Sequence, residues 1–286
     1  MFSLPILTYL VLAFTILDGV NGSGCVCADT KLCKPLPPPR LASPEFFAFA
    51  VDSSTSYPLY DWDTITTLAV AGELNPELVC IAHKTNTRVV KLVDIAKEDL
   101  VNQTAIQQSV EQNVGEMVMY GLDGINVDFE DYILKSETEY RDGLTNWVRQ
   151  LGEAMRKTEG GDGLQLSVDV AWSPAGIDER FFDYKALHEV SDLLFIMVYD
   201  TRSQFPAPCV AGANSPSSVV HDGLQAWKEE VGDLSRTVLG LPFYGYTYPC
   251  LQGTPTNATI CPIEPIHWRN ATCSDAAGSE WDYDLL

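Results

Sequence analysis

The sequence of 286 residues predicts an α/β fold, a (β/α)8 TIM barrel. Short runs of β-branched and aromatic residues alternate with longer segments of helical period, which is typical of βα units around a parallel sheet. The length also suits such a barrel, which needs about 250 residues. Seven of the eight strands are found, and they are predicted at residues 46–53, 65–71, 88–93, 124–130, 164–172, 193–199 and 238–244.

Helices are predicted between these strands at residues 76–84, 97–120, 136–157, 184–190 and 218–231. The first has Asn75 as N-cap and Pro76 at its first position, where proline loses no hydrogen bond. The second ends at Gly121, because glycine readily takes the left-handed conformation that stops a helix. Each predicted helix lies between two predicted strands, as expected for βα units.

No eighth strand is predicted. After Tyr246 the chain is rich in turn residues and cysteines, and it reaches Leu286 without another β-run. A barrel without this strand exposes the backbone edges of its first and seventh strands. We therefore expect a domain that is incomplete at its C-terminus, and an inactive truncated product is one alternative.

Residues 1–24 have the pattern of a signal peptide. Residues 1–17 carry no charge, and their apolar run is too short for a comfortable transmembrane helix. An uncleaved anchor is the alternative, because the usual positive charge at the N-terminus is missing. Residues 25–286 would then form one domain in the secretory pathway.

Eight cysteines follow the signal peptide, and their even number predicts up to four disulfides. The sequence identifies only Cys250–Cys261, as a local loop closure. Because the cysteine spacings do not fit zinc ligands and the histidines are scattered, no metal site is expected. Three sequons predict N-glycosylation at Asn102, Asn257 and Asn270.

The formal charge of −21, from 18 basic and 39 acidic residues, excludes most nucleic-acid binders. A field of this sign also repels anionic membrane surfaces and polyanionic substrates. Neutral or cationic partners are expected instead.

The segment 123–130, DGINVDFE, is the most informative in the chain. On a strand, Asn126, Asp128 and Glu130 share one face, and the apolar residues between them share the other. The apolar face would pack under the helices, so the polar face would point into the barrel with Glu130 at the carboxyl end, where barrel active sites lie. Folding alone does not favour two neighbouring buried carboxylates. The alternative is an exposed edge strand with a solvated acidic face.

This segment resembles the DGxDxDxE signature of glycoside hydrolase family 18, the chitinase family, with Asn126 in place of the usual aspartate. The runs DVAWSP at 169–174 and SDAAG at 274–278, with CVC at 25–27, resemble the chitobiase branch of that family more than its endochitinases. MVYD at 197–200 is similar to the MxYD motif of the sixth strand, and LPFYGY at 241–246 resembles the seventh. The resemblance covers nearly all of residues 25–286 and implies that they form the catalytic domain.

The resemblance implies hydrolysis assisted by the acetamido group of the substrate. Glu130, in a partly desolvated position, would hold a proton at mildly acidic pH and donate it to the glycosidic oxygen. Asp128 would accept the acetamido N–H, and the Tyr199 hydroxyl would hold the acetamido oxygen. Asn126 could still hydrogen-bond Asp128 but could not take up its proton. The residues expected to contact the substrate are Asn126, Trp172, Met197, Asp200 and Tyr244.

The function implied is a lysosomal exoglycosidase that cleaves the GlcNAc-β-1,4-GlcNAc (chitobiose) core of N-linked oligosaccharides, without a cofactor and as a monomer. Secretion is the alternative location. A chitinase-like sugar-binding lectin is the alternative function, but such lectins generally lose the acid. Because both Asp128 and Glu130 are present, the sequence favours the enzyme.

Overall fold

The computed structural model describes residues 26–38, 44–51, 56–201, 208–269 and 271–283. The predicted signal peptide lies outside these ranges. Within them, seven parallel strands pair in the order in which they occur along the chain. These are β1 (Phe47–Ala50), β2 (Thr67–Val70), β3 (Arg88–Val93), β4 (Gly124–Val127), β5 (Gln165–Ala171), β6 (Leu193–Met197) and β7 (Thr237–Gly240).

The sheet curls into a nearly closed barrel, as the sequence predicted. Phe47 and Phe49 of β1 reach across the interior to Phe195 of β6, with ring centroids 5.6 and 4.8 Å apart. Residues of the first and sixth strands therefore contact each other inside the curled sheet. The ends of the strand order, β1 and β7, are not paired with each other within the described residues.

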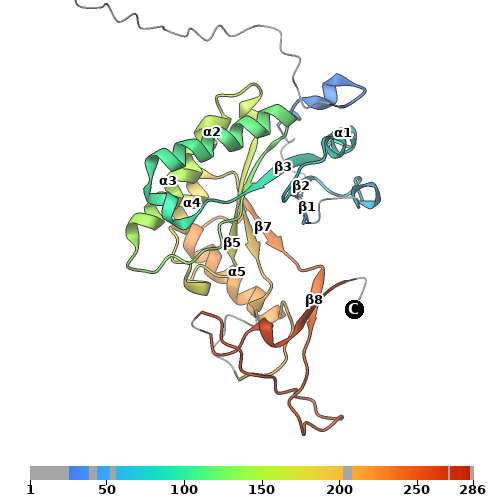
Figure 1. Cartoon of the computed structure of the whole chain (residues 1–286), viewed down its shortest axis with the longest axis vertical. Helices are drawn as coiled ribbons and strands as arrows, with labels where there is room; N and C mark the ends of the chain where they lie inside the picture. Colours follow the sequence, from blue (N-terminus) through green and yellow to red (C-terminus); the bar gives the residue numbers. More distant parts are fainter. Residues whose placement is uncertain (1–25, 39–43, 52–55, 202–207, 270, 284–286) are drawn as a thin grey trace, which may run out of the picture.

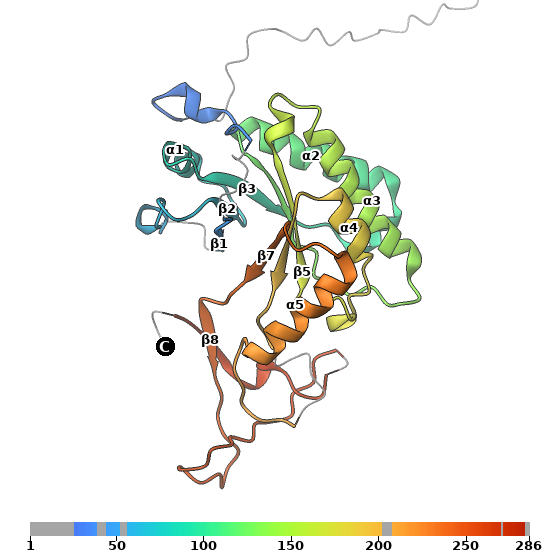
Figure 2. The same ribbon diagram turned by 180° about the vertical axis from the view of Figure 1, so that it is seen from behind.

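Helices cover the outside of the sheet (Figures 1 and 2). They are α1 (Pro76–Lys84), α2 (Gln103–Tyr120), α3 (Thr138–Met155), α4 (Tyr184–Val190) and α5 (Ser217–Val231). The predicted helix at 97–120 is wrong at its start. A 3-10 turn, Lys97–Val101, comes first, and Asn102 then caps α2 by accepting the backbone N–H groups of Thr104 and Ala105.

The predicted strand at 238–244 is also wrong at its end. β7 stops at Gly240, and Pro242, which has no N–H to donate, interrupts the run. Tyr244 begins a separate strand, β8 (Tyr244–Thr247), which pairs antiparallel with β9 (Ser279–Asp282). The expectation that no β-run follows Tyr246 is therefore wrong as well. This small sheet belongs to a C-terminal segment beyond the carboxyl ends of the barrel strands (Figure 1).

Disulfides join distant parts of the described chain. Cys27–Cys80 ties the N-terminal segment to α1, and Cys209–Cys273 and Cys250–Cys261 hold the C-terminal segment together. The last of these confirms the predicted loop closure. Within the described ranges, no helix has the length and apolarity needed to cross a membrane.

β4 lies at the centre of the sheet and carries the acidic segment. Ile125 and Val127 are fully buried under the helices. At Gly124 the neighbouring strand comes so close that a Cβ atom would lie 1.9 Å from the carbonyl oxygen of Gln165. Glycine is therefore needed at the position where the strand enters the barrel.

Candidate active site

The polar residues on and after β4 become more exposed toward the carboxyl end of the barrel. Asn126 is completely buried, Asp128 is partly buried, and the Glu130 side chain is 51% exposed. β4 ends at Val127, so the predicted strand is three residues too long. The backbone N–H of Asp128 still donates to the carbonyl of Val93 at 3.0 Å. Asp128 is thereby fixed to the end of β3, with Glu130 at the rim.

Asp128 is a carboxyl group that favours its proton. Burial raises its pKa to about 7, helped by the charge of Glu130 and a hydrogen bond with it. The nearby Arg180 cation opposes this shift only in part. At mildly acidic pH the pair formed by Asp128 and Glu130 therefore retains a proton.

Asp169 supplies a third carboxylate. Its residue lies on β5, and its side chain is enclosed, so that burial and the charge of Asp128 raise its pKa well above the usual range. The amide nitrogen of Asn126 donates to Asp169 Oδ1 at 2.9 Å and to the hydroxyl of Ser167 at 3.0 Å. The expected hydrogen bond from Asn126 to Asp128 is thus replaced by bonds to β5, because Asn126 pairs with Ser167 in the sheet register.

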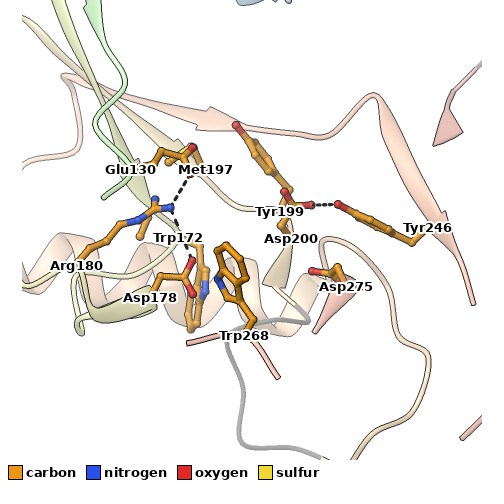
Figure 3. A pocket seen from close by; sticks show the side chains of 11 residues that line it. Glu130, Trp172, Asp178, Arg180, Met197, Tyr199, Asp200, Tyr246, Trp268 and Asp275 are labelled. Atoms are coloured by element: carbon orange, nitrogen blue, oxygen red, sulfur yellow. Dashed lines mark hydrogen bonds and ion pairs between the residues drawn. The ribbon is translucent and has the colours of Figure 1, made fainter. Parts of the chain in front are cut away.

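Glu130 is half exposed, and its carboxylate is paired with an arginine that the sequence did not predict. Nη2 of Arg180 donates to Glu130 Oε2 at 2.7 Å, and the same nitrogen lies 3.8 Å from Asp178 Oδ2 (Figure 3). The side chains of Arg180 and Asp178 are each only 8% exposed. Neither Arg180 nor Asp178 was predicted as a site residue from the sequence.

The loop that carries Asp178 and Arg180 follows β5 and has an unusual backbone. Asp178 and Glu179 both have positive φ angles, of 53° and 60°. Such conformations cost of order 1–3 kcal/mol each and persist only where the surroundings fix them. Here Ile133 fixes them, since its N–H donates to Glu179 and its carbonyl accepts from Phe181, both at 3.0 Å.

A cavity of about 210 Å³ opens beside these residues (Figure 3). Of the residues predicted to contact the substrate, Trp172, Met197 and Asp200 line it, as do Glu130 and Tyr199 from the predicted catalytic set. Burial raises the pKa of the Tyr199 hydroxyl, and the neighbouring carboxylates raise it further, so the hydroxyl keeps its proton and can donate. Asn126, Asp128 and Tyr244 do not contribute to the lining.

Asp200 connects the barrel to the C-terminal segment. Its carboxylate accepts the hydroxyl of Tyr244 at 2.8 Å and that of Tyr246 at 3.3 Å. Burial raises the pKa of Asp200 to about 6, although these two hydroxyl donors lower it. Tyr244 is therefore placed to orient Asp200, whereas Tyr246 reaches the cavity itself.

Several lining residues could not have been found by the strand patterns alone. Trp268 and Asp275 come from the C-terminal segment, and Arg180 and Asp178 come from the loop after β5. Outside the lining, Asp169 did have a sequence signal, because alternation along β5 places it two residues beyond the inward-facing Ser167. Loop residues have no such periodicity.

The described residues contain no group of three or more histidine, cysteine, aspartate or glutamate side chains arranged to hold a metal. Of the predicted glycosylation sites, Asn102 and Asn257 are exposed. Asn270 lies outside the described residues. Modification of these asparagines stays a prediction.

Comparison with known proteins relates this chain to sugar-cleaving enzymes. Residues 46–283 match the family model of the glycosyl hydrolases family 18. The di-N-acetylchitobiase of Rattus norvegicus is 36% identical over 277 residues, which cover 97% of this chain and 73% of the rat protein. A probable di-N-acetylchitobiase 2 of Dictyostelium discoideum is 38% identical over 270 residues, which cover 92% of this chain and 68% of that protein.

Solved structures of chitinases share the fold. The class V chitinase of Nicotiana tobaccum superposes with a TM-score of 0.61 at 17% identity, over 83% of this chain and 76% of that one. A chitinase from Bacteroides thetaiotaomicron gives a TM-score of 0.58 at 20% identity, over 72% of this chain and 69% of that one. At such identities the likeness concerns the barrel and not the substrate.

Proposed function

The chain belongs to the glycosyl hydrolases family 18 and is a glycosidase, and from this premise we propose that it cleaves the GlcNAc-β-1,4-GlcNAc bond of chitobiose cores in N-linked oligosaccharides. The names of its relatives support this substrate class. The observation that carries the proposal is the carboxyl pair of Asp128 and Glu130, which retains a proton beside a cavity lined by Tyr199 and Trp172.

The geometry supports a substrate-assisted mechanism, which glycosidases of this family use. Glu130 lies at the cavity wall, where its proton can pass to the glycosidic oxygen. The acetamido oxygen of the substrate attacks the anomeric carbon, and the leaving sugar departs with the proton. A water molecule, activated by the Glu130 carboxylate, then opens the oxazolinium ring with net retention of configuration.

Asp128 and Tyr199 act on the acetamido group in this proposal. Asp128 as a carboxylate accepts the acetamido N–H and stabilises the positive charge of the oxazolinium ring. Tyr199, whose raised pKa keeps its hydroxyl protonated, donates to the acetamido oxygen. Asn126 holds Asp169 and thereby fixes the carboxyl group that lies next to Asp128.

We further propose that the protein acts as a monomer in the lysosome, with secretion as the alternative location. The acidic composition supports the lysosome as the location. The protein's own negative charges, which add to −21, repel one another less strongly when carboxyl groups are protonated at acidic pH. An acidic compartment would also keep the proton on the Asp128–Glu130 pair.

The test is hydrolysis of N,N′-diacetylchitobiose by the full chain and by Glu130→Gln. The amide has the shape of the acid but no acidic proton, so turnover should fall by at least about 10²- to 10⁴-fold while the circular dichroism spectrum stays unchanged. The glycosylation-site variant Asn257→Gln, whose residue is exposed outside the cavity, should retain full turnover. Binding of the disaccharide without hydrolysis by the unmodified chain would indicate a lectin instead.

A further inference from the structure

Arg180 lies between two carboxylates at the cavity wall, and Figure 3 shows its contacts to both. It donates to Glu130 at 2.7 Å, while Asp178 is 3.8 Å from the same guanidinium nitrogen. The Nε–H of Arg180 is buried and has no acceptor among the described residues. The guanidinium thus has one firm partner, a second carboxylate close by, and an unused donor.

The pair of Arg180 and Glu130 poses a chemical problem for acid catalysis. A neighbouring cation favours the ionised form of a carboxyl group. A general acid, in contrast, must carry its proton when the glycosidic bond breaks. In the free protein, burial and the charge of Glu130 favour the proton on Asp128, while Glu130 accepts the hydrogen bond of Arg180.

We propose that Arg180 is a positioning residue that controls which carboxyl group holds the proton, by moving from Glu130 to Asp178 when a sugar enters the cavity. The inference rests on the proposed function. Once the guanidinium leaves, the proton passes from Asp128 to Glu130 along the hydrogen bond between them. Glu130 becomes the neutral acid, and Asp128 becomes the carboxylate that the oxazolinium ion requires.

The backbone around this pair is held in place, so the change needs only a side-chain movement. The bonds of Ile133 to the loop fix Arg180 relative to the segment after Glu130. Arg269 adds a second fixation, because its guanidinium donates to the carbonyl of Asp178 at 2.5 Å and to that of Glu130 at 3.1 Å. The guanidinium therefore has a fixed origin, and one of its nitrogens lies within ion-pair distance of both carboxylates.

Other charged and titratable groups also face Glu130, and they act on its carboxyl group together with Arg180. They come from the ends of the neighbouring strands and from the C-terminal segment: Asp94, Asp128, Asp169, Asp178, Tyr199 and Arg269. Most are acidic, and Arg180 is the cation that contacts the Glu130 carboxylate directly, whereas Arg269 binds backbone carbonyls. Replacement of Arg180 by a neutral residue should therefore raise the pH at which Glu130 titrates.

The first experiment is the pH profile of kcat/KM on N,N′-diacetylchitobiose. In Arg180→Met the cation is lost, so the basic limb should move up by about one pH unit. In Asp178→Asn the second partner is lost and Arg180 stays on Glu130, so the limb should move down and kcat should fall more than KM changes. Arg180→Lys keeps the charge and should restore the position of the limb.

The second experiment needs no substrate. In the full chain labelled with ¹³C at glutamate carboxyls, the Glu130 resonance is assigned by its absence from Glu130→Gln, and its titration is followed by NMR. Its midpoint should rise in Arg180→Met and fall in Asp178→Asn. Arg156→Met is the matched control, because Arg156 makes a comparable pair with Asp192 at 2.6 Å away from the cavity.

The two experiments separate the failure of each proposal. If the unmodified chain does not cleave the disaccharide but the NMR midpoints move in opposite directions, the function is wrong and the control by Arg180 stands. If Arg180→Met folds and its midpoint stays at the unmodified value, the inference is overturned. If Arg180→Met does not fold, the test uses Asp178→Asn. A Glu130 titration midpoint that stays at the unmodified value in this variant overturns the inference as well.

Discussion

Asp128 occupies the position in this site where a change of charge has the greatest consequence. Its Oδ1 atom is buried without a hydrogen-bond partner among the described residues. A carboxyl group in this state gains a partner when the acetamido N–H of a substrate arrives. Binding of the substrate should therefore favour the ionised form of Asp128, at the moment when positive charge develops on the sugar.

We predict that Asp128→Asn slows the hydrolysis of N,N′-diacetylchitobiose by about 10²- to 10³-fold, because the amide cannot neutralise the oxazolinium ion. The measurement is kcat for this variant and for Ser167→Ala, which removes a neighbouring hydroxyl without changing any charge. Equal loss in the two variants would contradict the electrostatic role. Unchanged kcat in Asp128→Asn would contradict substrate assistance.

At the residue scale, the sequence predicted the acidic face but not its partners. Alternation along residues 124–130 correctly places Asn126 inside and Glu130 at the rim. The partner of Asn126 depends on strand register, which sets Ser167 beside it. The partner of Glu130, Arg180, lies 50 residues away on a loop whose backbone conformation no local pattern predicts.

At the scale of the elements, the approach of β4 to β5 fixes where the acidic segment enters the barrel. The carbonyl of Asp123 accepts the N–H of Gln165 at 2.8 Å, and Gly124 lies against the backbone of the same residue. Any side chain at position 124 would push the two strands apart. Asn126 and Asp169, which meet across this pair of strands, would then separate.

We therefore predict that Gly124→Ala destabilises the protein by about 1–3 kcal/mol and lowers activity, because its Cβ would lie 1.9 Å from a backbone oxygen. Gly115→Ala is the matched control. Gly115 lies in α2, and a Cβ added there would meet no atom within 4 Å, so alanine should stabilise the helix by about 0.5–1 kcal/mol. Urea unfolding measures both variants, and changes of the same sign would contradict the steric argument.

The bounds of helices and strands were predicted correctly where one physical signal dominates the local sequence. α1 and α4 begin and end where the sequence indicated, because α1 carries a cap and a proline and both are short crossovers. The strand at 88–93 has its predicted bounds, and the other six were predicted too long, since apolar runs continue into loops that remain buried, as Phe129 does. The β8–β9 pair was missed because residues 248–278 separate its two strands, and no local pattern reveals so distant a contact.

On the scale of the whole molecule, buried ionisable groups make stability depend on pH. Burial alone would lower the pKa of His83, but its hydrogen bond and charge contact with Asp123 outweigh this and raise it. Both ring nitrogens of His83 face acceptors, Leu32 O at 2.7 Å and Asp123 Oδ2 at 2.9 Å. Asp123 also accepts the N–H of Leu36, so the charged pair fastens the N-terminal segment to the barrel.

These groups act in the same direction. A raised pKa at His83 gives stability that is complete below its ordinary value of 6.5 and is lost as the pH rises through the folded value. The raised pKa of Asp128, about 7 against 3.8, gives stability that is complete below 3.8 and is lost as the pH rises to about 7. Glu116 and Asp233 act oppositely, because their pKa values are lowered and their contribution disappears only below about their ordinary values of 4.5 and 3.8.

We predict that the free energy of unfolding is greatest near about pH 4.5 and falls by on the order of 3 kcal/mol between pH 5 and pH 8. Urea unfolding at pH 5 and pH 8 is the measurement. In His83→Gln the loss between these pH values should shrink, since glutamine can still donate to Asp123 but does not titrate. The exposed His221→Gln should leave the pH dependence unchanged. Equal stability at the two pH values would show that neither Asp128 nor His83 is protonated in the folded protein as its surroundings require.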